Sequence, residues 1–115
     1  MKSARDPRHI KRIKIVQQLF GLPFKTKPPA AIQNILDKLP EIDPLIAQAA
    51  PEWPLEKINH IDLAILRASV YELTVDRTTP LKVIIDEAIE IAKEFGAESS
   101  PGFINGVLGK IVNKI

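Results

Sequence analysis

Apolar residues recur every three or four positions along most of this chain, which is the spacing of amphipathic helices. The clearest stripe follows Thr79 and Pro80 and stops at Gly96, a residue type that commonly ends helices. We therefore expect one well-defined helix here, with a buried face. That face comprises Leu81, Ile84, Ile85, Ala88, Ile91, Ala92 and Phe95.

The segment from Asn59 to Leu73 is apolar on nearly every side, because it combines Ile61, Leu63, Ala64, Ile65, Leu66, Ala68, Val70 and Tyr71. A helix of this kind belongs in the middle of a bundle, where every face is covered. Asn59 at its start is a residue type that caps helix N-termini.

Two further helices have N-terminal signatures in which a capping residue precedes proline. Asp6 and Pro7 precede a basic amphipathic helix over 8–20, and Asp43 and Pro44 predict a short helix that stops before Pro51. Apolar spacing predicts another helix over 29–39, after a proline-rich loop. No stretch alternates apolar and polar residues as a strand does, so the pattern predicts an all-α bundle of about six or seven helices.

The last predicted helix starts at Ser99 or Ser100 and turns Ile104, Val107, Leu108, Ile111 and Ile115 inward. It also contains Gly102, Gly106 and Gly109, and each interior glycine costs about 1 kcal/mol relative to alanine. Since Gly106 and Gly109 lie one turn apart, we expect another backbone to pack closely against them. Gly106→Leu should then unfold the protein.

The 115 residues suit a single domain, 1–115, with 45% hydrophobic and 26% charged residues. No apolar run approaches the roughly 20 residues that cross a bilayer, and no secretory signal is evident. Because cysteine is absent, disulfides and thiol chemistry are excluded, and a cytoplasmic location is the default expectation.

Charge is distributed unevenly along the chain. Residues 1–27 contain eight basic side chains and one acidic one, a net of +7, so the remaining residues must carry −5 for the total of +2. A basic arm on an acidic body is typical of nucleic-acid-binding proteins, although solvated or membrane-surface arms share it. The basic side chains are those of Lys2, Arg5, Arg8, Lys11, Arg12, Lys14, Lys25 and Lys27.

Residue patterns for enzymatic chemistry are missing from the sequence. It lacks the nucleophile, zinc-protease and phosphate-loop motifs, and its two histidines, His9 and His60, lack ligand spacing. Asp86, Glu87, Glu90 and Glu94 are expected on the solvated side of their helix, opposite its apolar stripe. We predict no catalytic residue, no metal site and no cofactor.

Phe103 is the most informative aromatic residue. It falls at the margin of the buried stripe of the last helix, near Ser99, Ser100 and the free backbone N–H groups of the helix start. An exposed ring beside an anion site is the combination that binds single-stranded RNA, although an ordinary core phenylalanine has the same spacing.

Two blocks of sequence closely resemble the NusB family of transcription antitermination factors. They read IDLAILRASVYEL (Ile61 to Leu73) and TPLKVIIDEAIEIAKEFGAESSPGFINGVLGKI (Thr79 to Ile111), and cover about half of the chain. The basic first helix, ending at Leu19 and Phe20, also resembles the family's N-terminus. The resemblance implies an all-helical fold of two packed sub-bundles.

The resemblance also implies a function, which is binding of boxA RNA together with ribosomal protein NusE so that RNA polymerase reads through terminators in ribosomal RNA operons. The implied RNA contacts are Arg5, Arg8, Lys11, Arg12, Phe20, Ser99 and Phe103, and Gly102 would leave room for the strand. Glu56 and Asp62 match acidic positions on the family's partner surface. Some family members self-associate, so a homodimer is a further possibility.

Two alternative functions remain open at this stage. Similar helical domains are fused to ribosomal RNA cytosine methyltransferases, so the chain could be a stand-alone RNA-targeting module of that kind. It could also be a purely structural interaction module.

Overall fold

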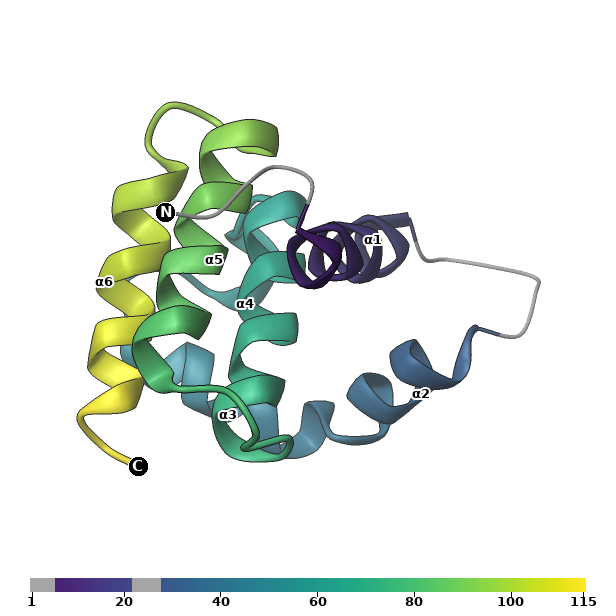
Figure 1. The fold of residues 1–115 in the computed structure, drawn as a ribbon. Helices are drawn as coiled ribbons and strands as arrows, with labels where there is room; N and C mark the ends of the chain where they lie inside the picture. The colour runs from purple at the N-terminus through teal and green to yellow at the C-terminus, as the bar shows by residue number, and fades with distance from the viewer. Residues whose placement is uncertain (1–5, 22–27) are drawn as a thin grey trace.

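The computed structural model describes residues 6–21 and 28–115, and every regular element within them is helical. They comprise six α-helices (Figure 1) and one turn of 3-10 helix, η1 (Leu55–Lys57), before the fourth. The all-α prediction is therefore confirmed. The helices are α1 (Pro7–Gly21), α2 (Ala30–Asp37), α3 (Leu39–Ala49), α4 (His60–Thr74), α5 (Leu81–Phe95) and α6 (Ser100–Val112).

The central helix of the fold is α4, which packs against each of the other five. Ile65, Leu66 and Val70 on this helix are completely buried. Figure 1 shows α4, α5 and α6 running side by side, while α1 crosses beside α4, and α2 and α3 pass along the bottom of the view. The near-continuous apolar character of residues 59–73 thus has the predicted cause, because neighbours surround α4.

Side-chain caps start two of the helices as predicted. The Asp6 carboxylate accepts a hydrogen bond from the backbone N–H of Arg8 at 2.9 Å, and α1 begins at Pro7. Asn59 Oδ1 accepts from the N–H of Ile61 at 2.8 Å at the start of α4. Each cap satisfies a backbone donor that the helix itself leaves unpaired.

The predicted start of α3 at Asp43 and Pro44 is wrong. The helix begins at Leu39, with Pro40 in its first turn, and Pro44 lies inside it. Pro44 is exposed, so water can satisfy the carbonyl group that its missing N–H leaves unpaired. Asp43 pairs with Arg67 of α4 instead of capping, with N···O distances of 2.9 and 3.0 Å. This ion pair joins α3 to the central helix.

Three residues assigned to buried stripes are exposed because they lie at helix ends. Leu81 starts α5 and Phe95 ends it, and Ile115 follows α6. The helix period is correct at these positions, but it does not show how completely the end of a helix is covered.

The glycines of α6 do not have the packing role expected of them. A Cβ atom added at Gly102, Gly106 or Gly109 would meet no atom of another part of the protein within 4 Å. The prediction that Gly106→Leu unfolds the protein is therefore wrong for the isolated chain. The close approach is at Gly96 instead, where an added Cβ would lie 2.6 Å from Cβ and Oγ of Ser100.

No helix in the described ranges is long and apolar enough to cross a membrane.

Candidate nucleic-acid interface

One face of α1 presents a line of cations to solvent. Arg8, Lys11 and Lys14 follow one another at three-residue intervals, so they lie on one side of the helix, and all three are exposed. We call these three residues the basic stripe. The Arg8 side chain is 83% exposed, and its nearest partner is the capping residue Asp6, with Nη2 at 3.2 Å from Oδ2. Arg5, which was also predicted to contact RNA, lies outside the described residues.

Arg12 does not belong to the basic stripe, although the sequence analysis included it among the RNA contacts of the basic arm. Its guanidinium turns inward and donates from Nε and Nη2 to the two oxygens of Glu72, both at 2.8 Å. Nη1 lies 3.2 Å from Oε1 of Glu87, and only 15% of the side chain is exposed. These hydrogen bonds raise the pKa of Arg12, chiefly through Glu72. The residue therefore joins α1 to α4 and α5.

His9 and Glu87 form a second buried contact between α1 and α5. Nδ1 of His9 lies 3.2 Å from both carboxylate oxygens of Glu87. Glu87 is only 1% exposed, so its assignment to the solvated face of α5 is wrong. Its sequence position contained the signal, because Glu87 follows Ile84 by three residues and precedes Ile91 by four, on the buried stripe.

A cleft of about 340 Å³ borders the basic stripe and lies among α1, α2, α4 and α5. Lys11 lies at its α1 side, and its apolar lining includes Ile15, Ile35 and Ala68. Phe20 ends the same helix with half of its surface exposed. Arg8 and Phe20 are separated along α1 by about 18 Å, at 1.5 Å per residue. Helix α1 thus offers both cations and an exposed ring along one element.

The start of α6 is less open to a ligand than the sequence suggested, because one of its two serines is buried. Ser99 is exposed, but its side chain makes no capping bond. Ser100 is completely buried, and its hydroxyl accepts a hydrogen bond from the N–H of Ala97 at 2.9 Å. Phe103 packs one side of its ring against the core and keeps the rest accessible, as expected at the margin of the stripe.

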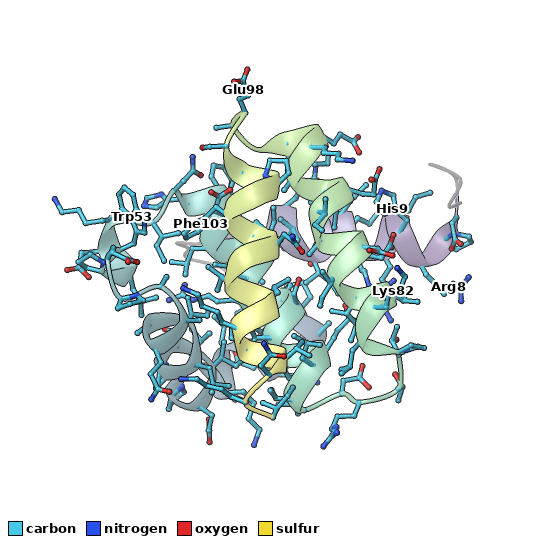
Figure 2. All side chains as sticks on the ribbon, turned by 90° about the vertical axis from the view of Figure 1, so that its left-hand side faces the viewer. Arg8, His9, Trp53, Lys82, Glu98 and Phe103 are labelled. Carbon is cyan, nitrogen blue, oxygen red and sulfur yellow. The ribbon has the colours of Figure 1, made fainter. Side chains whose placement is uncertain are left out.

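The predicted RNA-contacting residues do not form one cluster. Figure 2 shows Phe103 on α6 on the same side of α5 as Trp53, whereas Arg8 and His9 lie on the other side of α5. Trp53, in the turn between α3 and η1, was not among the predicted site residues, although it is 52% exposed. Any single strand that touches both Phe103 and the basic stripe would have to cross α5.

The two acidic residues expected at a partner surface differ in exposure. Glu56 lies in η1 and is exposed. Asp62 is only 6% exposed, so its expected place on an open surface is wrong. Burial raises the pKa of the Asp62 carboxyl, although a hydrogen bond with the Ser100 hydroxyl partly opposes this shift. Its Oδ1 atom has no hydrogen-bond partner among the described residues.

The described residues contain no cluster of metal-ligating groups. Within 6–21 and 28–115, no three histidine, cysteine, aspartate or glutamate side chains lie close enough together to hold a metal ion. The interface is thus characterised by cations, exposed rings and a cleft, which suit a polyanion better than a small reactive substrate.

Similarity to known proteins agrees with this geometry. The chain is 45% identical over 75 residues to transcription antitermination protein NusB of Chloroflexus aggregans, which covers 64% of this chain and 50% of that protein. Its identity to the protein of the same name from Lachnoclostridium phytofermentans is 43% over 80 residues, covering 70% and 61% respectively. The chain thus matches about half to three fifths of the length of these curated relatives.

The fold has a close counterpart among solved structures. T. maritima NusB, form 2, superposes with a TM-score of 0.81 at 30% sequence identity, covering 99% of this chain and 94% of that one. Residues 29–113 match the family model described as "NusB family". On this match, together with the shared fold, the chain belongs to the NusB family.

Proposed function

We propose that this chain is a non-enzymatic, cytoplasmic transcription antitermination factor that binds boxA-type single-stranded RNA together with ribosomal protein NusE. In this role it would join the RNA polymerase complex that reads through terminators in ribosomal RNA operons. The observation that carries the proposal is the basic stripe, three exposed cations on one face of α1 in a chain of this family. The relatives' name, transcription antitermination protein, supports the same role.

The basic stripe suits a phosphate backbone. Each phosphate that it neutralises releases counterions, so affinity for single strands falls with a log–log slope of about −0.7 per contact. Three cations would therefore add a slope of about −2. Arg8 adds a planar guanidinium that can donate two parallel hydrogen bonds to one phosphate.

Exposed rings suit the bases of the same strand. Base stacking on an aromatic ring contributes about 1–3 kcal/mol and tolerates any base. Phe20 and Phe103 are partly open to solvent and are the proposed stacking positions, with Ser99 beside the second. Because α5 separates α6 from α1, we propose that the strand passes over α5 between the two groups.

The protein partner would contact a different part of the surface. Glu56 in η1 is an exposed carboxylate, and we propose that it faces a basic region of NusE. Asp62 is buried in the free protein, so any contribution from it would act through the start of α4 and α6.

An RNA titration with and without NusE, at two salt concentrations, tests this proposal. The heterodimer should bind a short boxA-like RNA more tightly than a scrambled one, and the double variant Lys11→Gln with Lys14→Gln should weaken binding and flatten the salt dependence. Lys38→Gln with Lys114→Gln, which changes two exposed lysines outside α1, is the charge-matched control. Equal affinity for the two RNAs would contradict the proposal and favour a general RNA-targeting module.

A further inference from the structure

We propose that Glu87 is a positioning residue for RNA binding. It fixes the orientation of α1 about its helix axis, so that the basic stripe faces the RNA strand. The inference rests on the proposed function but concerns a residue that has no surface to contact RNA. It is carried by three observations, namely how α1 is anchored, what Glu87 contacts, and how those contacts lie relative to the cations.

Polar contacts anchor the first half of α1. Val16 is the buried apolar residue of this helix, and it lies in the second half. In the first two turns the buried side chain is His9, whereas Ile10 is exposed and Ile13 is partly buried against the core. Arg8 and Lys11, two of the three cations of the basic stripe, lie in these first turns. Their placement therefore depends on the ion pairs and hydrogen bonds of His9 and Arg12 as well as on the packing of Ile13.

Glu87 contacts two residues of α1 that lie one helical turn apart. Its carboxylate is 3.2 Å from Nδ1 of His9 and 3.2 Å from Nη1 of Arg12. Arg12 is held in turn by Glu72 of α4 and has Thr79 Oγ1 at 3.5 Å. Two anchors at this spacing define a line along the helix, so they prevent α1 from rolling about its axis.

The cations lie at a constant angle to these anchors. Arg8 immediately precedes His9, and Lys11 immediately precedes Arg12. Successive residues of an α-helix differ by about 100° around the axis. Holding His9 and Arg12 against Glu87 therefore turns Arg8 and Lys11 outward. Buried ion pairs add little net stability over apolar packing, and in some proteins they specify geometry.

The test compares Glu87→Gln with Glu90→Gln, which changes the net charge equally. Glu90 lies three residues further along α5, is exposed, and pairs with Lys93 at 3.4 Å. Hydrogen exchange of the α1 amides reports the anchoring, and RNA titration at low salt reports the function. The ¹⁵N chemical shift of His9 Nδ1 reports loss of the carboxylate contact. A purely structural change elsewhere would leave this chemical shift unaltered.

We expect Glu87→Gln to shift the His9 Nδ1 signal, to speed exchange in the first turns of α1, and to weaken RNA binding about tenfold. Glu90→Gln should change none of these. If Glu87→Gln does not fold, Glu72→Gln should produce the same faster exchange and weaker binding, because it releases Arg12 from its bidentate partner.

Two outcomes would overturn the inference. Unchanged exchange of the α1 amides would show that Glu87 does not hold the helix. Faster exchange with unchanged or tighter RNA binding would show that rotation of α1 does not limit binding. The exchange measurement needs no RNA, so failure of the proposed function, seen as no RNA binding by the wild-type protein, remains distinguishable from failure of the anchor.

Discussion

Arg12 and Glu72 form a bidentate ion pair that ties α1 to α4, with both N···O distances at 2.8 Å. The pair is largely covered, since the exposed fractions of the two side chains are 15% and 20%. Among the described cations of the basic arm, Arg12 is therefore a structural link, and the exposed Arg8, Lys11 and Lys14 remain available to a polyanion.

Replacing Arg12 should cost stability. Removing one partner of a buried ion pair costs about 3–5 kcal/mol, and we expect about 2 kcal/mol for Arg12→Met because water reaches part of this pair. Urea unfolding measures the loss. The matched control is Arg8→Met, whose side chain is exposed, and it should change the free energy of unfolding by less than about 0.5 kcal/mol. Equal losses for the two variants would contradict the assignment of Arg12 as a link.

Asp6 stabilises the start of α1 as a cap, but its negative charge should weaken RNA binding. The Asp6 carboxylate pairs with Arg8, whose hydrogen bonds lower the pKa of Asp6. Asp6→Asn retains an acceptor for the N–H of Arg8 but removes the competing charge. We expect tighter RNA binding at low salt and a smaller gain at high salt, measured by titration. Weaker binding would mean that Asp6 orders Arg8 for the strand.

The glycines of this protein should respond to alanine in opposite ways. Gly106→Ala should raise the free energy of unfolding by up to about 1 kcal/mol, because the new methyl group meets no atom within 4 Å and glycine is a poor helix former. Gly96→Ala should destabilise, since its Cβ would overlap Ser100. Thermal unfolding of both variants checks this, and destabilisation by Gly106→Ala would contradict the open space around α6.

Asp62 should make stability fall as pH rises. Burial raises its pKa above the ordinary value of 3.8, so the folded protein keeps the proton to higher pH than the unfolded chain does. The penalty for the buried charge is absent below 3.8 and is complete above the raised pKa. Asp62→Asn should therefore gain stability relative to the wild type between acidic and neutral pH in urea unfolding. A constant difference across this range would exclude the effect.

Local sequence signals determined the class and most of the elements of this protein. Apolar spacing identified α4 and α5 and the central place of α4, and the caps at Asp6 and Asn59 were evident because a cap needs only residues within one turn. The start of α3 was misplaced for the same reason. Asp43 and Pro44 form a valid local signature of a helix start, but the Asp43 carboxylate pairs with Arg67 on another helix.

The tertiary structure decided which charged residues have a buried partner, although the helix period already placed Glu87 on the buried stripe of α5. Arg12 and Glu87 resemble their exposed neighbours Lys11 and Glu90 in sequence, yet they are paired inside because α1 lies across α4 and α5. The packing of the helices also left free space beside the glycines of α6, and it buried Asp62. A helical period records which side of a helix is apolar, whereas the partner that covers a polar group comes from a distant segment. The sequence by itself therefore determined the helices and the basic arm, and only their packing decided which of the described cations remain exposed.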